Sequence, residues 1–353
     1  MSALEAIYQE FGADVAPFMH RLRDEVQDTK PYKGLRIAHD IPLTRTTLIK
    51  VDSLLKGGAD LLVSNFSFCT PDAYALKVLE ENKIPYKPVH EISGEFDVLM
   101  DCGAELLENC TAKLGAVELT RTGAVAYQNA HTPYPVISVD DTRLKQLETC
   151  LGTGEGVHRA IVNLAGRDLT DAKVMIFGFG KVGRGIAHYF KTITDDITIA
   201  EMDEKRLKVA TDRDLKVVSA DQADEVETLA RSADVIITAT GLKDIISRSY
   251  DTSAFLNGPL LANAGAEDEF GYDFKDSDIL GAKVPVNFTE NEPTLMKFLD
   301  PIFYAHTVAL NDLLEGRAPG FHALNRVTDN AVMADWCRFH NRTEEELEAI
   351  FGP

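Results

Sequence analysis

Three glycines and a glutamate near the middle of the chain have the spacing that binds a dinucleotide. Gly178, Gly180 and Gly183 follow the apolar run 173–177 in the pattern G-x-G-x-x-G. In a strand–turn–helix unit, the first glycine allows the tight turn, the second lets the backbone approach a pyrophosphate, and the third lets helix and strand pack closely. Glu201 ends the next apolar run about 20 residues on, where a carboxylate can bind the ribose of an adenosine. This order predicts a dinucleotide-binding unit.

The same segment indicates which dinucleotide is bound. A 2′-phosphate beside Glu201 would meet an uncompensated negative charge, so the site favours NAD over NADP. Lys181 and Val182, between the second and third glycines, start the expected helix, whose N-terminus faces the phosphates. A structural glycine turn that holds no ligand is the alternative interpretation.

The composition argues against several other classes of protein. The chain has 353 residues and a formal net charge of −20, which opposes binding to nucleic acid or to an anionic membrane. No apolar run approaches the ~18 residues of a membrane span, and the first residues lack the pattern of a signal peptide. Five scattered cysteines fit reduced thiols, and nine dispersed histidines give no metal-ligand spacing. We therefore expect a cytoplasmic protein without a metal.

Short apolar strands alternate with helical stretches along most of the chain, which is typical of α/β proteins with parallel sheets. The glycine-rich unit follows a complete set of such alternations, and the chain from residue 292 on is mostly helical. We therefore expect a Rossmann-type NAD-binding domain at 153–316, inserted into a second α/β domain that binds the substrate. That substrate domain would comprise 1–152 and 317–353, and the C-terminal helices would complete it.

Short motifs distributed over the chain carry a resemblance to a known family. They are the sequences at 19–23, 30–38, 43–44, 67–72, 101–103, 118–123, 139–145, 240–241, 263–265 and 325–334. From about residue 18 to about residue 334, the chain resembles the adenosylhomocysteinases, which hydrolyse S-adenosylhomocysteine. In that family a tightly held NAD oxidises the ribose 3′-hydroxyl, and a base then removes the acidified C4′ proton. The thiol at C5′ is eliminated, water adds, and the hydride returns.

The resemblance implies that the cofactor side of the family's site is kept. Thr120 and Thr122 match positions that contact the nicotinamide end of NAD. The glycine turn matches as well. The other matching cofactor positions are Glu201, Thr240, Gly241 and Asn263.

The substrate side departs from the family at most positions. Cys102 stands where the family has a catalytic aspartate, and Leu119 where it has a catalytic glutamate. Lys145 matches the family's lysine, but Thr149 and Cys150 replace the aspartate–asparagine pair that follows it. The other replaced positions, three histidines and the adenine-holding glutamate, are Pro42, Ala266, Ala318 and Thr46. The family's C-terminal tail, which reaches the NAD of a neighbouring subunit, has no counterpart in this sequence.

Lys145 is the main catalytic candidate. A lysine whose pKa is lowered by burial or by nearby positive charge could take a hydroxyl proton while NAD takes the hydride. An ordinary surface lysine is the alternative. Asp101, Cys102 and Cys150 are further catalytic candidates, although small apolar packing is the favoured interpretation of both cysteines. For His306, another candidate acid–base group, a structural role is favoured.

Five residues border the expected substrate cleft, namely Thr44, Arg45, Thr46, Glu118 and Arg121. The two arginines would suit a carboxylate or phosphate on the substrate, and the glutamate a cationic group. For each charged side chain, a solvated surface, a helix cap or an ion pair is the alternative.

These observations lead to one main functional hypothesis and two alternatives. We expect an NAD-dependent enzyme that oxidises a hydroxyl group on a small-molecule substrate other than S-adenosylhomocysteine. Whether the reaction stops at the ketone or continues to elimination is open. The alternatives are a true adenosylhomocysteinase with a remodelled site and a non-catalytic, NAD-binding regulatory protein. We also expect a homo-oligomer, most simply a dimer, because most soluble oligomers are two-fold.

Overall fold

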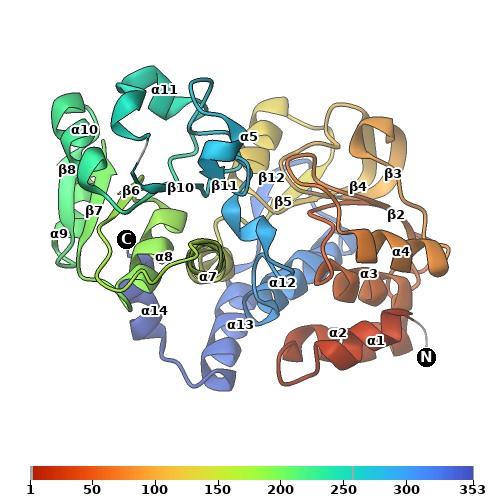
Figure 1. Cartoon of the computed structure of the whole chain (residues 1–353). Coiled ribbons are helices and arrows are strands. Elements are labelled where there is room, and N and C mark those ends of the chain that lie inside the picture. The colour runs from red at the N-terminus through yellow and green to blue at the C-terminus, as the bar shows by residue number, and fades with distance from the viewer. Residues whose placement is uncertain (1–2, 257, 353) are drawn as a thin grey trace. The chain divides into compact units, whose positions relative to one another are not determined.

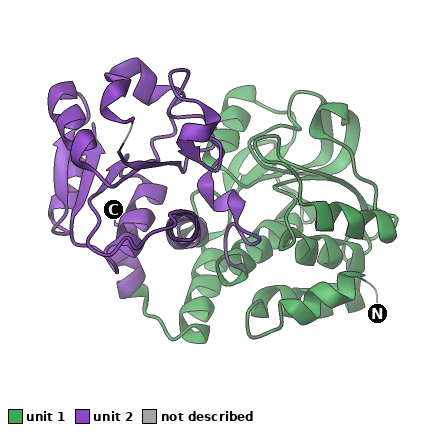
Figure 2. Cartoon of the chain, viewed as in Figure 1, with its two compact units in different colours: residues 1–145, 296–344 green, residues 146–295, 345–353 purple. Residues whose placement is uncertain are grey.

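The computed structural model describes residues 3–256 and 258–352 (Figure 1). The chain divides into two compact units, each built on a six-stranded parallel sheet. The first unit comprises residues 1–145 and 296–344, and the second comprises residues 146–295 and 345–353 (Figure 2). The expected α/β fold class is confirmed in both units.

The sheet of the second unit is doubly wound. Its strands are β6 (Val174–Phe177), β7 (Ile197–Glu201), β8 (Lys216–Ser219), β9 (Val235–Thr238), β10 (Leu260–Asn263) and β11 (Ile279–Leu280). They lie in the order β8-β7-β6-β9-β10-β11, so the chain runs outward from the middle in both directions. This is the strand order of the Rossmann fold, and its ligand crevice opens where the order reverses, between β6 and β9.

Helices cover both faces of this sheet, which explains why its central strands are apolar throughout. They are α7 (Gly154–Leu164), α8 (Lys181–Phe190), α9 (Glu204–Thr211), α10 (Ala223–Ser232) and α11 (Ile245–Ser249). Every residue of β6 is buried. Ile176 packs in a core with Ile186 and Phe190 of α8, whereas Phe177 packs in a second core with Val226 of α10. Alternate residues of one strand therefore belong to opposite cores.

Glycines determine how closely helix α8 is held. A Cβ on Gly185 would overlap the carbonyl oxygen of Cys150, and a Cβ on Gly154 would lie 2.5 Å from the carbonyl carbon of Gly185. Helix α8 thus packs backbone to backbone on the π-helical segment η2 (Leu147–Thr153) and on the start of α7. This contact fixes the helix that begins at the glycine turn.

The strand order also reverses in the sheet of the first unit. Its strands are β1 (Arg36–Asp40), β2 (Asp60–Ser64), β3 (Gly94–Asp101), β4 (Cys110–Glu118), β5 (Pro135–Ser138) and β12 (Gly320–Ala323). They lie in the order β2-β1-β3-β4-β5-β12, and the order reverses between β1 and β3. In open α/β sheets, ligands bind at the carboxyl ends of the strands beside such a reversal. The carboxyl ends of β1 and β3 are therefore where this rule places a ligand of the first unit.

The helices of the first unit come from both ends of the chain. They are α1 (Ala3–Glu10), α2 (Pro17–Thr29), α3 (Thr47–Lys56), α4 (Ala73–Glu81), α5 (Arg121–Ala130), α6 (Arg143–Gln146), α12 (Met296–Leu314) and α13 (Arg326–Phe339). Within the described ranges, no helix has both the length and the apolar character needed to cross a membrane.

The limits of the two units differ from the expected domain limits at 152/153 and 316/317. Helix α12 groups with the first unit because it packs on α2 and β4, and the carboxylate of Asp300 accepts the backbone N–H groups of Phe18 and Met19 at 2.9 and 2.8 Å. Most of α14 (Glu344–Phe351) groups with the second unit, where Arg213 donates a hydrogen bond to the carbonyl of Ile350.

Candidate cofactor and substrate sites

The glycine turn lies at the strand reversal of the second unit. Gly178 follows β6 with φ +89°, and a Cβ there would lie 2.5 Å from the carbonyl oxygen of Ala239, which follows β9. A Cβ on Gly183 would overlap the carbonyl oxygen of Gly178. At Gly180, by contrast, the nearest atom is a guanidinium nitrogen of Arg206 at 4.0 Å. Two of the three glycines are therefore required by packing, and the third leaves space beside the backbone.

The start of helix α8 provides an anion site next to that space. Gly180 is the N-terminal cap of the helix, and no side chain caps its first turn. Lys181 and Val182 form this turn and are half-buried. Uncapped backbone N–H groups and the helix dipole attract a phosphate group. The turn thus fits the pyrophosphate of a dinucleotide.

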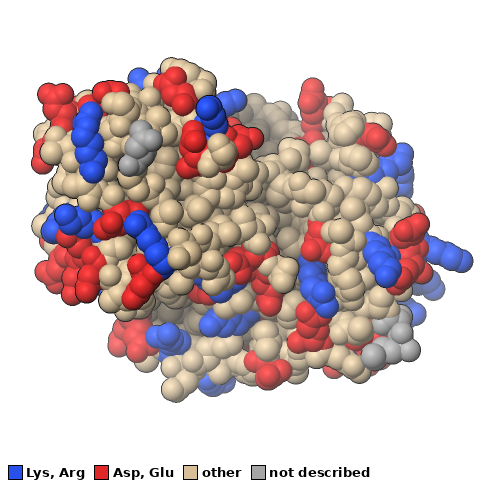
Figure 3. Space-filling view, in the orientation of Figure 1, with Lys and Arg blue, Asp and Glu red and all other residues tan. Residues whose placement is uncertain are grey.

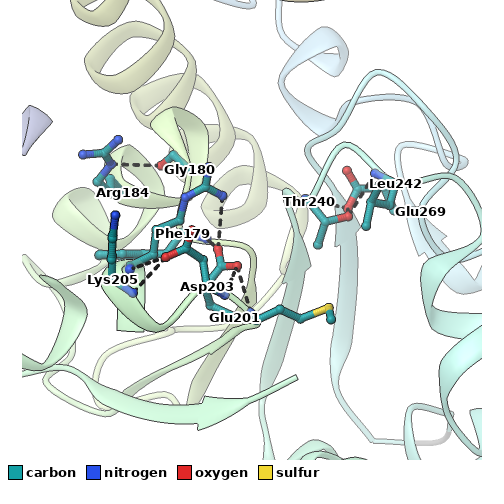
Figure 4. A network of polar contacts seen from close by, with 11 residues as sticks. Phe179, Gly180, Arg184, Glu201, Asp203, Lys205, Thr240, Leu242 and Glu269 are labelled. Carbon is teal, nitrogen blue, oxygen red and sulfur yellow. Dashed lines mark hydrogen bonds and ion pairs between the residues drawn. The ribbon is translucent and has the colours of Figure 1, made fainter. Parts of the chain in front are cut away.

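Glu201 is held rigidly at the end of β7 (Figure 4). One carboxylate oxygen accepts the N–H of Phe179 at 2.8 Å, and the other accepts the N–H groups of Met202 and Asp203 at 2.8 and 3.1 Å. Although burial opposes it, these hydrogen bonds lower the pKa of Glu201. The side chain is therefore a fixed carboxylate beside the glycine turn.

Arg206 corrects one premise of the prediction made from the sequence. Its guanidinium lies 3.5 Å from the Oε2 atom of Glu201. This half-exposed cation offsets only part of the negative charge of Glu201, so the charge is not wholly uncompensated, as the sequence analysis assumed.

Thr240 and Gly241 are organised by a buried carboxylate that the sequence analysis missed. Glu269 accepts the backbone and hydroxyl hydrogens of Thr240 at 2.8 and 2.7 Å, and the N–H of Gly241 at 2.7 Å (Figure 4). Asn263 lies next to this loop, and its amide nitrogen donates to the carbonyls of Glu267 and Lys283. An acid shortly after the Asn-Ala-Gly sequence is the only signal that could have indicated Glu269.

Thr120 and Thr122 belong to the first unit, at the start of helix α5. The hydroxyl of Thr120 donates to Glu118 at 2.7 Å and accepts the N–H of Gly123, which caps the helix. Thr122 is exposed and its hydroxyl lies 3.4 Å from that of Thr120. The structure thus places these two expected cofactor contacts on a different unit from the glycine turn.

Glu118 and Asp101 end neighbouring strands and are fully buried. Glu118 accepts the N–H groups of Gly103 and Ala104 at 3.0 and 3.1 Å. Asp101 accepts the hydroxyl hydrogen of Tyr127 at 2.6 Å. Burial, with the neighbouring Glu118, raises the pKa of Asp101. These partners give both carboxyl groups a structural role in the loop after β3 and at the start of α5.

Asp40, which the sequence analysis did not single out, ends β1 at the strand reversal of the first unit. It is fully buried, with the side chains of Ser64 and Glu105 as its polar neighbours and no short, well-aligned hydrogen bond to either carboxyl oxygen among the described residues. Burial and the nearby Glu105 raise the pKa of Asp40 to about 8. At neutral pH it is therefore mainly a neutral acid that can donate a hydrogen bond.

Lys145 and the two candidate cysteines are all buried. Lys145 is 9% exposed in α6, and its backbone N–H donates to the hydroxyl of Thr142 at 3.0 Å. Burial raises the pKa of the Cys102 thiol, although the positive charge of Lys145 lies near enough to oppose this shift. Burial likewise raises the pKa of Cys150, in the second unit, to about 12. Both thiols are therefore protonated at neutral pH, and Lys145 is not a surface lysine.

The expected substrate-binding residues have partners of their own. Arg45 donates to Glu10 at 2.8 and 2.6 Å and lies over the ring of Tyr74. Arg121 is exposed and lies 3.6 Å from Asp141. The hydroxyl groups of Thr44 and Thr46 are 2.8 Å apart, at the start of α3. Of the two arginines, Arg121 has the weaker ion pair.

In the first unit, the buried side chains of one lysine and two histidines contact one another in a row. The amine of Lys50 on α3 lies 3.0 Å from Nε2 of His39 and 2.8 Å from Nδ1 of His306. The other ring nitrogen of His306 lies 3.0 Å from the carbonyl oxygen of Val117 and donates to it. All three side chains are fully buried, and burial lowers the pKa of each. The structural role favoured for His306 thus includes partners that the sequence analysis missed.

The described residues contain no group of three or more histidine, cysteine, aspartate or glutamate side chains that could hold a metal ion.

Lysine and arginine side chains are interspersed with acidic ones over the face of the molecule shown in Figure 3.

Comparison with known proteins identifies the second unit. Residues 152–273 match the model of the S-adenosyl-L-homocysteine hydrolase NAD binding domain. The chain is 26% identical over 285 residues to S-inosyl-L-homocysteine hydrolase of Methanopyrus kandleri, which covers 73% of this chain and 66% of that protein. It is 29% identical over 275 residues to adenosylhomocysteinase of Aeropyrum pernix, which covers 70% of this chain and 64% of that protein. The chain thus matches just under two thirds of the length of these relatives.

A solved structure supports the fold alone. The crystal structure of a dipicolinate synthase polypeptide from Bacillus halodurans has a TM-score of 0.53 and 12% sequence identity, over 80% of this chain and 99% of that one. With the matched domain model, the glycine turn and the Rossmann strand order agree on NAD as the cofactor.

Proposed function

We propose that this chain is a divergent member of the adenosylhomocysteinase family and an NAD-dependent enzyme that oxidises a hydroxyl group on a small molecule other than S-adenosylhomocysteine. In this proposal the second unit binds NAD and the first unit binds the substrate.

The contrast between the two units carries this proposal. By its resemblance to the family, the second unit keeps the glycine turn, Glu201 and Thr240 as cofactor positions. In the first unit, Cys102 replaces an acid at the carboxyl end of β3, and its buried thiol has a raised pKa. A protonated thiol is a poor general base, so the family's C4′ proton abstraction loses one of its groups. Oxidation alone needs only the cofactor and one base.

The residues of the first unit supply what oxidation requires. In this proposal the deprotonated form of Lys145 takes the hydroxyl proton with the lone pair of its amine, as the O–H bond breaks and the C=O bond forms. The neutral acid of Asp40, at the strand reversal, donates a hydrogen bond to a polar atom of the substrate. Asp101 and Glu118 hold the adjoining loop and the start of α5. The glycine turn and Glu201 would hold NAD, which would supply the acceptor for the hydride of the carbinol carbon and so balance the two electrons of the oxidation.

A second candidate function is hydrolysis of a nucleosyl-homocysteine thioether. It is favoured by the relatives, which are named as hydrolases of S-inosyl-L-homocysteine and S-adenosylhomocysteine. In that case oxidation would be followed by loss of the thiol. A non-catalytic, NAD-binding regulatory protein is the remaining alternative.

One experiment separates the three functions. The purified protein with bound NAD is incubated with S-adenosyl-L-homocysteine, S-inosyl-L-homocysteine and a panel of nucleosides and small alcohols. We expect reduced nicotinamide to accumulate with one alcohol and no thiol to be released from either thioether. Thiol release at an enzymatic rate would support the hydrolase instead. An unchanged nicotinamide with every compound would support the regulatory protein.

We also propose that the protein forms a homodimer, because two-fold assemblies are the commonest among soluble oligomers. Light scattering coupled to size-exclusion chromatography tests this proposal, and a monomer at micromolar concentration would contradict it.

A further inference from the structure

The first unit has a surface cavity that contains none of the residues assigned to the NAD and substrate sites. It has a volume of about 260 Å³ and lies between helices α2 and α12 and the start of α13. Leu22, Val26 and Leu324 form an apolar wall, whereas Glu25 and Asp312 form an acidic one. The volume is just below the ~300–1,000 Å³ of most ligand pockets, so the cavity suits a small molecule.

Two helices that run in the same direction end at this cavity. Asp300, near the start of α12, accepts the N–H groups of Phe18 and Met19 at the start of α2. Thr29, the last residue of α2, and Asp312, near the end of α12, both line the cavity. The negative ends of the two helix dipoles therefore lie together. Neither helix has a basic residue in its last turn, although a cation at such an end is stabilising.

The chain neutralises the acidic wall only in part. Arg317, which follows α12, pairs with Asp312 at 2.8 Å. Glu25 is exposed, and within the described part of the chain no basic side chain forms an ion pair with it. Lys30, the residue after α2, is exposed to solvent. A cation in the cavity would thus meet one unpaired carboxylate and two negative helix ends.

Tyr32 places an unused polar group in the wall of the same cavity. It lines the cavity and is fully buried, yet its hydroxyl has no hydrogen-bond partner among the described residues. Burial and the nearby Glu25 raise the pKa of Tyr32, so the hydroxyl stays neutral. A buried polar group without a partner costs free energy, and a phenolic oxygen can accept a hydrogen from an ammonium group. A ligand amine would therefore satisfy this hydroxyl.

We propose that this cavity binds a small organic cation, with its ammonium group at Glu25 and Tyr32 and its apolar part against Leu22 and Val26. An organic cation fits better than a metal ion, because the cavity has an apolar wall and the described residues contain no group of side chains that could hold a metal. The net charge of −20 also attracts cations to the chain. All the lining residues belong to the first unit, so the proposal is independent of NAD binding and of the proposed reaction.

Phenethylamine and 2-phenylethanol test the proposal, because they have similar shapes and only the amine is charged at neutral pH. Nuclear magnetic resonance of each probe, titrated with purified protein, measures binding. The amine should bind at least about tenfold more tightly than the alcohol, because its donor is charged. Glu25→Gln should weaken binding of the amine by about tenfold, and Tyr32→Phe by about threefold. Asp24→Asn removes an exposed acid of the same helix that does not line the cavity, and it should leave the affinity unchanged.

The stability of the protein without a probe gives a second measurement. Because the hydroxyl of Tyr32 has no partner, Tyr32→Phe should not lower the melting temperature. A clearly lower melting temperature would mean that this hydroxyl already has a partner, and would count against its part in binding.

Three results would overturn the proposal. They are no saturable binding of phenethylamine up to about 10 mM, equal binding of the alcohol, and an unchanged affinity in Glu25→Gln. If Tyr32→Phe does not fold, Glu25→Gln decides the question, because Glu25 is exposed and its replacement has nearly the same shape.

Discussion

The amine of Lys50 lies 2.8 Å from Nδ1 of His306, and both side chains are fully buried. Because the other ring nitrogen of His306 donates to Val117, Nδ1 accepts a hydrogen from the lysine. Among the described residues, the amine of Lys50 contacts two imidazole nitrogens and no carboxylate. An ammonium ion would be costly there, so the lysine is held as a neutral amine.

A neutral Lys50 makes stability depend on pH. Burial lowers its pKa in the folded protein, whereas the unfolded chain binds its proton up to about pH 10.4. Below about pH 10 the unfolded state therefore holds more protons than the folded state, and stability rises with pH by at most ~1.4 kcal/mol per pH unit from this group. Urea unfolding of native and Lys50→Met proteins at several pH values measures the effect. The variant should lose this part of the slope, and the exposed Lys77→Met should keep it.

Asp40 should give a pH dependence of the opposite sign. Its pKa is raised to about 8 in the folded protein, so the folded state holds a proton that the unfolded state has lost. Its contribution to stability is present below about pH 4 and decreases as pH rises to about 8. In the proposed site, substrate affinity should also fall above pH 8, where the acid ionises. Asp40→Asn keeps a donor without a titration, and its Michaelis constant should be constant across this range. A native protein with an equally constant value would exclude Asp40 from substrate binding.

Lys145 should be required for oxidation but not for the cofactor. In Lys145→Ala, turnover should fall by about 10²–10⁴-fold, because a positioned base is lost. Calorimetry should find NAD affinity unchanged, since the glycine turn and Glu201 belong to the second unit. Lys87→Ala, which removes an exposed lysine of the first unit, is the matched control. Full turnover in Lys145→Ala would remove this lysine from the mechanism.

The glycines of the turn should respond differently to the same substitution. Gly183→Ala forces a Cβ against the carbonyl of Gly178 and should destabilise the protein by about 1–3 kcal/mol. Gly180→Ala meets only the movable Arg206, so it should preserve the melting temperature while weakening NAD binding. Thermal unfolding and calorimetry on both variants check this difference. Equal destabilisation would mean that the space beside Gly180 is not reserved for the cofactor.

The sequence predicts features that depend on neighbouring residues and misses those that depend on distant ones. The turn at Gly178 could be predicted because a strand, a tight turn and a helix follow one another within a few residues. The contact of Lys50 with His306 joins residues 256 positions apart, so no local pattern indicates it. Arg45 was expected to bind substrate, but its partner Glu10 comes from the first helix of the chain. A side chain's partner is decided by packing that local spacing does not encode.

During synthesis, the strands of the second unit's sheet are all made before the last strand of the first unit's sheet. All six strands of the NAD-binding sheet lie between residues 174 and 280. The first unit is incomplete until two later parts of the chain are made. These are the edge strand β12 and Asp300, which accepts the N–H groups of Phe18 and Met19 at the start of α2. The ribosome therefore finishes all the strands of the cofactor-binding sheet while the N-terminal segment, although made earlier, still lacks β12 and Asp300. The six-stranded sheet of the second unit can therefore form before the sheet of the first unit has its last strand.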